Sequence, residues 1–227
     1  MDAEVNLDEG PDYTNRDFRF RRLVTKFAVR ARRKFYSRFL DFMQPEAQDT
    51  IIDVGVTPDS ELEDSNFLEK WYPHPEEITA TSIEDASNIE NFIPGVTFVR
   101  TEGRRLPFED KQFAIAFSTA VVEHVGDRES QMAFVSEMLR VGNRFFITTP
   151  NRWYPLEIHT FLPFLHWLPR TMHQRILRAL GKNQWATTEN LNLLSKKQLL
   201  ALFPPGAQVQ MTTVRTFGMS SNLIVYG

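Results

Sequence analysis

Between Thr50 and Pro150 the sequence alternates short apolar runs with amphipathic stretches, and this alternation limits the possible folds more than any other feature. The apolar runs are rich in Ile, Val, Phe and Thr, which is typical of strands that are buried on both faces. Strands and helices in alternation form right-handed crossovers, so the sequence predicts an α/β fold with a doubly wound, mostly parallel sheet. Strands are predicted at 50–55, 77–83, 96–101, 113–119 and 144–150, and helices at 66–71, 86–92 and 128–141.

A long amphipathic helix is predicted before the first strand, over residues 15–43. Its Phe, Leu and Val residues recur at steps of three and four and give one apolar face, while Arg and Lys crowd the rest, and Pro45 ends it. This pattern is typical of a helix that packs on a domain with a basic face in solvent; a lid, or a docking surface for an anionic substrate or membrane, is the alternative. We therefore divide the chain into 1–44, a tail with a basic helix, and 45–227, a single domain.

An aromatic-rich insertion follows the fifth strand. Residues 152–192 carry tryptophans, phenylalanines and prolines, which break the alternation and predict a cap over the carboxyl edge of the sheet. A helix with Ser195 as its N-cap is predicted at 195–203. Two further strands, at 208–217 and 222–226, are predicted to close the fold.

The composition excludes several classes of function. The 227 residues carry a formal net charge of −3, which gives no whole-protein argument for nucleic-acid binding, and no nucleic-acid motif is present. The absence of cysteine excludes disulfides, thiolate metal sites and cysteine nucleophiles. The acidic N-terminus has no apolar core and does not resemble a signal peptide, and no apolar run is long enough to span a membrane. We expect a cytoplasmic protein.

Two segments resemble a known family. Residues 98–125 read FVRTEGRRLPFEDKQFAIAFSTAVVEHV, in which one apolar strand ends in an acid and a second is followed by Glu123 and His124. Residues 51–55 read IIDVG, another strand that ends in an acid and a glycine. The two segments resemble the class I methyltransferases that use S-adenosylmethionine, in particular the type 11 branch. The resemblance implies a Rossmann-like sheet with a terminal antiparallel strand, and methyl transfer to a small-molecule, sugar or lipid-linked acceptor.

The resemblance also implies where the cofactor binds, because ligands of such sheets lie outside the carboxyl ends of the strands. The loop after the first strand keeps Gly55 but lacks the further glycines that are usual in the family. A residue after the second strand is expected to bond both ribose hydroxyls; Ser82 and Glu84 remain alternatives, and Ile83 is expected to pack on the adenine. The expected cofactor contacts are Asp53, Gly55, Val56, Thr57, Ser82, Ile83, Glu84, Glu102, Gly103 and Thr119.

A histidine follows the fourth strand, beside the expected position of the sulfonium. His124 is the candidate general base, because the unperturbed pKa of histidine lies close to working pH. Three histidines of the insertion recur at steps of seven, but prolines interrupt any helix that would align them, so no metal site is predicted. The candidate substrate contacts follow the fifth strand: Asn151, Trp153, Tyr154 and His159.

A non-catalytic relative is the alternative function, namely a binding or scaffold protein that keeps the fold and has lost the cofactor. The glycine-poor loop after Gly55 favours this alternative, as does Ala114, which stands where the family usually has an acid. A dinucleotide-dependent oxidoreductase would need a G-x-G-x-x-G turn, which is absent. The expected partners are a small-molecule or lipid-linked acceptor and, through the basic helix, the surface of a membrane.

Overall fold

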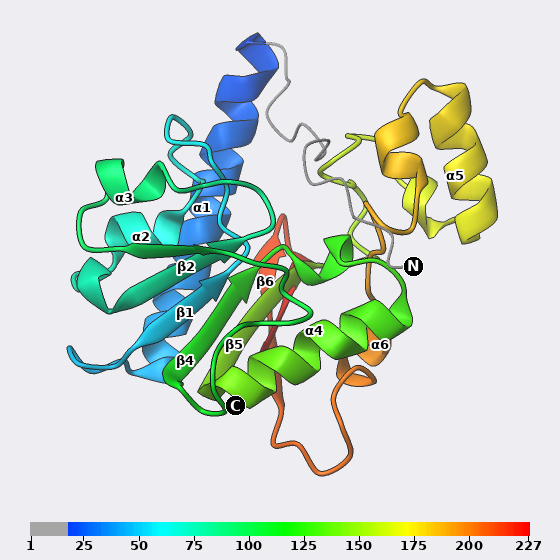
Figure 1. The fold of residues 1–227 in the computed structure, drawn as a ribbon. Helices are drawn as coiled ribbons and strands as arrows, with labels where there is room; N and C mark the ends of the chain where they lie inside the picture. The colour runs from blue at the N-terminus through cyan, green and yellow to red at the C-terminus, as the bar shows by residue number, and fades with distance from the viewer. Residues whose placement is uncertain (1–17) are drawn as a thin grey trace, which may run out of the picture.

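A seven-stranded sheet forms the centre of the molecule, in the order β3-β2-β1-β4-β5-β7-β6 (Figure 1). The computed structural model describes the backbone of residues 18–227 and the side chains of residues 28–227. Strands β1 to β5 are parallel, and β7 is antiparallel to both β5 and β6. The strands are β1 (Ile51–Val54), β2 (Ile78–Ser82), β3 (Thr97–Arg100), β4 (Phe113–Thr119), β5 (Gly142–Pro150), β6 (Gln210–Thr216) and β7 (Met219–Tyr226).

Helices cover both faces of this sheet (Figure 1). Helices α1, α2 and α3 pack on one face, and α4 and α6 pack on the other. Helix α5 belongs to the insertion and lies away from the sheet. The helices are α1 (Phe18–Met43), α2 (Phe67–Trp71), α3 (Ile89–Phe92), α4 (Arg128–Val141), α5 (Arg170–Ala179) and α6 (Lys196–Leu200), with short 3-10 turns η1 (Pro75–Glu77), η2 (Val122–His124), η3 (Leu165–Trp167) and η4 (Asn183–Ala186).

Two hydrophobic cores follow from the alternation of side chains along the strands. Ile51 and Phe117 belong to the core under α1 and α2, whereas Ile52 and Ala116 belong to the core under α4. Successive residues of a strand point to opposite faces of the sheet, so a strand that is covered on both faces needs apolar residues throughout. This requirement explains the continuous apolar runs in the sequence.

The C-terminal half of α1 is anchored to the sheet by aromatic contacts. Phe39 is fully buried, and its ring lies edge to face 5.1 Å from that of Phe117 and 5.7 Å from that of Phe146. Phe42 stacks on Tyr226 of β7 at 4.2 Å. The predicted apolar face of the helix is confirmed for these side chains, and its earlier members lie outside the described side chains. Helix α1 therefore shares the core of the sheet.

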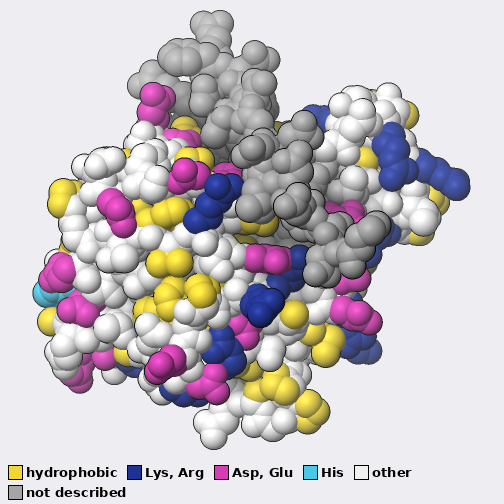
Figure 2. Space-filling view, in the orientation of Figure 1, with side chains coloured by type: hydrophobic (Ala, Val, Ile, Leu, Met, Phe, Trp, Pro, Cys, Tyr) yellow, Lys and Arg dark blue, Asp and Glu magenta, His cyan; other side chains and the backbone are white. Residues whose placement is uncertain are grey.

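The predicted α/β class and the mostly parallel sheet are confirmed, with small differences at the ends of elements. The last strand begins at Met219 rather than at residue 222, because Met219 pairs with Thr216 across a turn at Phe217 and Gly218. Both turn residues have positive φ. Figure 2 shows acidic and basic side chains interspersed on the face that carries α4. Among the described residues, no helix is both long enough and apolar enough to cross a membrane.

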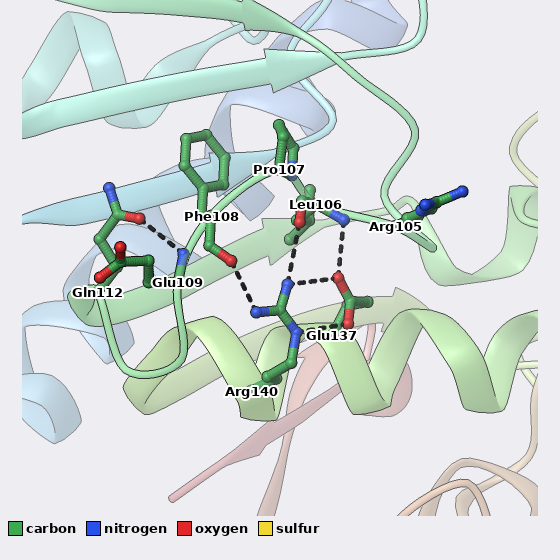
Figure 3. A pocket seen from close by; sticks show the side chains of 8 residues that line it. All are labelled: Arg105, Leu106, Pro107, Phe108, Glu109, Gln112, Glu137 and Arg140. Atoms are coloured by element: carbon green, nitrogen blue, oxygen red, sulfur yellow. Dashed lines mark hydrogen bonds and ion pairs between the residues drawn. The ribbon is translucent and has the colours of Figure 1, made fainter.

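The loop after β3 is fixed to the end of α4 by Arg140 (Figure 3). Its guanidinium donates to the carbonyls of Leu106 and Phe108, at 3.0 and 2.7 Å, and pairs with Glu137. Glu137 accepts a further hydrogen bond from the Leu106 N–H at 2.7 Å. These residues line a surface depression near the amino ends of β4 and β5, at the opposite edge of the sheet from the strand exits. The Leu-Pro-Phe segment therefore fixes a loop and lies away from the candidate site.

Truncation of Phe39 to alanine should destabilise the protein strongly. The change removes a fully buried ring that contacts two strands, and such substitutions cost about 3–5 kcal/mol. Leu40→Ala is the control, because Leu40 is the next residue of the same helix and is 37% exposed. Urea denaturation followed by circular dichroism measures the free energy of unfolding of both variants. Equal losses in the two variants would contradict the anchoring role of Phe39.

Candidate functional site

The loop after β1 begins the candidate site. Asp53 is buried near the end of β1, and the N–H groups of Gly55 and Val56 both donate to the carbonyl of Thr81 on β2. Gly55 has a φ of +112°, and a Cβ at this position would collide with Val121. Glycine is therefore required at position 55 by the positive φ and by the close approach of the Val121 side chain.

Asn66 closes the same loop from its far side. Its side chain accepts a hydrogen bond from the Thr57 N–H at 2.9 Å and donates to the Thr57 carbonyl at 2.8 Å. The Thr57 amide is thus occupied within the protein, whereas the Thr57 hydroxyl oxygen is buried without a hydrogen-bond partner in the described part of the chain. Thr57 could bond a ligand through its amide or its hydroxyl. Among the described residues the amide already has a partner, so the hydroxyl is the group that remains for a ligand.

A pair of buried carboxyl groups lies behind this loop. Asp53 and Glu69 of α2 are close enough to influence each other's ionisation, Glu69 is 1% exposed, and both of its carboxylate oxygens are buried without a hydrogen-bond partner among the described residues. Burial raises the pKa of both groups, and the pKa of Asp53 is raised further by the charge of Glu69. Arg32 of α1 opposes the shift of Asp53. Its guanidinium also lies over the ring of Phe67 at 5.5 Å, so α1 brings a cation to the inner wall of the site.

The exits of β2 and β3 present the groups expected to hold the adenosine. Ser82 is buried at the end of β2, and its hydroxyl accepts a hydrogen bond from the Glu84 N–H at 3.2 Å. Ile83 is 49% exposed, although it is a large apolar residue at a strand end. Glu102 follows β3 and pairs with Arg104, and a Cβ at Gly103 would press on Phe134 and Val54. Thr119, the last residue of β4, pairs in register with Thr148 of β5.

Two histidines meet where β4 ends and the insertion folds back. His124 lies in η2, and its Nε2 is 3.1 Å from Nε2 of His159. His124 Nδ1 is 2.6 Å from the carbonyl of Asn190, and His159 Nδ1 is 2.5 Å from Oε1 of Glu157. The ring of Trp185 packs 4.8 Å from that of His159. The structure therefore brings together the predicted catalytic histidine and one predicted substrate contact.

The electrostatics of this pair are set by burial and by two carboxylates. Burial, and then the charge of His159, lowers the pKa of His124 to about 3, so its imidazole is neutral at pH 7. Burial alone would raise the pKa of Glu157, but the charge of His159 and hydrogen bonds from His159 and Thr160 hold it at about 2. Burial raises the pKa of Glu123 to about 6 against the opposing effects of His159 and of the Thr149 hydroxyl.

The other predicted substrate contacts have different surroundings. The side-chain amide of Asn151 donates to the Ser220 carbonyl at 2.9 Å, and its oxygen accepts from the Trp153 N–H at 3.1 Å. Trp153 is 55% exposed and packs its ring against that of Trp167. Tyr154 is half-buried, and burial raises its pKa. Asn151 thus fixes the start of the insertion, and a substrate contact by these three residues stays a prediction.

Sequence reasoning assigned no role to several residues that shape the site. Glu69 and Arg32 lie on helices whose pattern suggests solvent-facing charges, and no local signal marks them. In the turn 157–160, Glu157 accepts hydrogen bonds from the N–H groups of His159 and Thr160, and no residue pattern announces that a glutamate does so. Asn190 contributes only its backbone, which no residue pattern reveals.

The central part of the chain is similar to known proteins. Residues 73–147, about a third of the chain, match the family model described as a methyltransferase domain. A ubiquinone biosynthesis O-methyltransferase of Brucella anthropi is 34% identical over 82 residues, which make up 35% of this chain and 33% of the relative. The corresponding protein of Brucella ovis is 33% identical over the same shares. The chain thus spans about a third of the length of the curated relatives it matches.

Solved structures extend the likeness to almost the whole chain. An S-adenosylmethionine-dependent methyltransferase of Thermotoga maritima aligns with a TM-score of 0.56 and 17% identity, over 92% of this chain and 93% of that one. The magnesium protoporphyrin IX methyltransferase of Synechocystis aligns with a TM-score of 0.55 and 12% identity, over 94% and 89%. At these identities the likeness shows the fold. Residues 73–147 are therefore similar to a methyltransferase domain, and the chain has the fold of the class I S-adenosylmethionine-dependent methyltransferases.

Proposed function

We propose that the protein transfers a methyl group from S-adenosylmethionine to a small-molecule, sugar or lipid-linked acceptor. The observation that carries the proposal is the order of groups along one edge of the sheet. Acids or hydroxyls follow β1, β2 and β3, and the His124–His159 pair follows β4. Ligands of open α/β sheets bind at this edge. The curated relatives are named for ubiquinone biosynthesis, which supports including lipid-linked acceptors.

The residues at the strand exits fit this cofactor. The exposed Ile83 offers an apolar surface for a base, and Ser82 and Glu84 stand on either side of it at the end of β2. The buried carboxyl groups of Asp53 and Glu69 suit a cationic ligand, because a nearby positive charge favours the ionised form of both. Ser82 and Glu84 remain the two candidate ribose contacts, and a carboxylate at position 84 would offer two acceptors to a diol.

The chain's own contribution to the reaction is positioning. When bound, S-adenosylmethionine supplies an electrophilic methyl group, and in-line transfer requires the acceptor atom to be aligned with it. His124 Nε2 lies 3.1 Å from Nε2 of His159, and the neutral imidazole of His124 is the group that we expect to receive the proton of an acceptor hydroxyl. Glu157 holds His159 beside it through hydrogen bonds to both its ring and its backbone. The aromatic insertion supplies the apolar wall that small-molecule sites use.

The surface of a membrane is a further proposed partner. A contact of the basic α1 with an anionic membrane stays a prediction. Arg33 pairs with Glu63 and Arg38 pairs with Asp41, and these ion pairs neutralise part of the charge of the helix.

A non-catalytic scaffold is the second candidate function, and the occupied Thr57 amide favours it. Calorimetry with S-adenosylhomocysteine separates the two functions, because a scaffold that has lost the site shows no binding.

Glu84→Gln should weaken S-adenosylhomocysteine binding at least tenfold, which is about 1.4 kcal/mol. The change replaces a carboxylate that is expected to accept hydrogen bonds from both ribose hydroxyls. Asp85→Asn is the matched control, because Asp85 is the next residue, is exposed, and accepts a hydrogen bond from the Ser87 N–H within its own turn. Isothermal titration calorimetry measures both. An unchanged affinity in Glu84→Gln together with a loss in Ser82→Ala would assign the ribose contact to Ser82.

Glu69→Gln should change how stability depends on pH. A carboxyl group whose pKa is raised by folding stabilises the protein below the unfolded pKa of about 4, and that contribution is lost as pH rises through the folded pKa. The ligand-free protein should therefore lose stability as pH rises above this value, and Glu69→Gln should reduce the loss. Thermal melts between pH 4 and pH 8 measure the effect, with the exposed Glu61→Gln as control. Parallel profiles for all three proteins would contradict the buried pair.

His124→Ala should lower turnover by roughly 10²–10⁴-fold and leave the affinity for S-adenosylhomocysteine almost unchanged. This is the range expected when general acid–base help is lost. His74→Gln is the control, because His74 lies before β2 and contacts Glu76 on the surface. Single-turnover assays with radiolabelled cofactor and a panel of small hydroxylated acceptors give the rates. A loss of less than tenfold would make His124 a contact rather than a base.

A further inference from the structure

Three side chains with metal-ligating atoms converge where β4 ends and the insertion folds over it. Nε2 of His124 and Nε2 of His159 are 3.1 Å apart, and Oε1 of Glu123 is 3.8 Å from the first of them. One ligand atom from each residue lies within 4.8 Å of the other two. The residues come from two segments that are far apart in the sequence, so no ligand spacing along the chain announces the cluster.

The second nitrogen of each imidazole is held by an acceptor. His124 Nδ1 faces the carbonyl of Asn190, and His159 Nδ1 faces the carboxylate of Glu157. A carbonyl and an ionised carboxylate accept hydrogen bonds and do not donate them, so these partners assign the proton of each ring to Nδ1. The two Nε2 lone pairs then point at each other across 3.1 Å. This arrangement requires either an extra proton or a cation between the rings.

Glu123 discriminates between a proton and a cation. Its side chain is fully buried, and Oε2 accepts a hydrogen bond from the Thr149 hydroxyl at 2.8 Å. Oε1 is buried without a hydrogen-bond partner in the described residues. A proton shared by the two histidines leaves this oxygen without a hydrogen bond, because the nearest imidazole nitrogen is 3.8 Å away, whereas a cation satisfies all three ligand atoms. The supporting hydrogen bonds at both Nδ1 atoms are those that metal-ligating histidines usually make.

We propose that Glu123, His124 and His159 bind one divalent cation of the zinc class, with a further position open to an oxygen ligand. At a zinc–nitrogen distance of about 2.0–2.1 Å, the two Nε2 atoms subtend roughly 100° at the ion, between the octahedral and tetrahedral angles. Glu123 must turn inward by roughly 1 Å to complete the set. Two histidines and a glutamate with an open position form the ligand set of a catalytic zinc site. With a cation bound, His124 Nε2 would be a ligand and not a base, so the open position is the alternative to the base role proposed above. Its use by a methyl acceptor rests on the proposed function, whereas the cation site does not.

Calorimetry with zinc chloride on the chelator-treated full chain tests the proposal. We expect about one equivalent to bind, and His159→Ala to weaken binding at least a hundredfold. Glu157→Gln changes a partner of His159 Nδ1 that is not itself a proposed ligand, and should weaken binding by about 10–100-fold, as changes to such supporting residues do. His173→Gln is the matched control, because His173 lies on α5 of the same insertion and should leave the affinity unchanged.

A second measurement keeps the test independent of how the variants fold. X-ray absorption on the zinc-loaded native protein should show two imidazole nitrogens at about 2.0–2.1 Å. No saturable binding to the native chain, or undiminished binding when His124→Ala and His159→Ala are combined, would overturn the proposal. Titration of the same samples with S-adenosylhomocysteine separates the two ideas. Zinc binding without cofactor binding would remove the proposed function alone, and the reverse result would remove the cation site alone.

Discussion

The parallel pairing of β1 with β2 and β4 is the constraint on which the site depends. Asp53 stands in register with Ala80 on one side and with Phe117 on the other, so the residues after all three strands emerge at one edge of the sheet. Loops that lie far apart in the sequence meet there because parallel strands share a direction. The two covered faces of the sheet hold this register, since a shift by one residue would move every core side chain to the opposite face.

Buried charge is the main cost of the arrangement. Four carboxyl groups are largely removed from water at this edge, and each is compensated differently: Asp53, Glu69, Glu123 and Glu157. Glu157 accepts hydrogen bonds from two backbone N–H groups, a hydroxyl and an imidazole, which accounts for the low pKa of its carboxyl group. Burial raises the pKa of both Asp53 and Glu69, and the charge of Arg32 opposes the shift of Asp53. An isolated buried charge is expensive, so incomplete compensation at a strand edge marks a place where a ligand belongs.

The sequence predicted the fold better than the site, for physical reasons. Apolar runs such as 113–119 identify buried strands because both faces are covered, and an acid after a strand identifies its exit. The occupied Thr57 amide depends on Asn66, which adopts a positive φ that the pattern does not announce. The sequence pattern groups His159 with His166 and His173 at steps of seven, whereas in the structure His159 meets His124 from another segment. His166 Nε2 instead donates a hydrogen bond to the Tyr154 carbonyl at 2.8 Å.

The insertion forms one side of the candidate site, and the exits of the strands form the other. Its turn at 157–160 is fixed by its own hydrogen bonds, so His159 is presented by a locally rigid unit. The other end of the insertion is tied to η2 and α4, because the Asn192 N–H donates to the Glu123 carbonyl at 2.7 Å and Gln131 of α4 donates to the Asn192 carbonyl at 3.0 Å. Under the proposed function, exchange of the insertion would alter the acceptor side of the site while the exits of β1, β2 and β3 remain as they are. The sheet would then determine where the cofactor binds, and the insertion would determine which acceptor lies beside it.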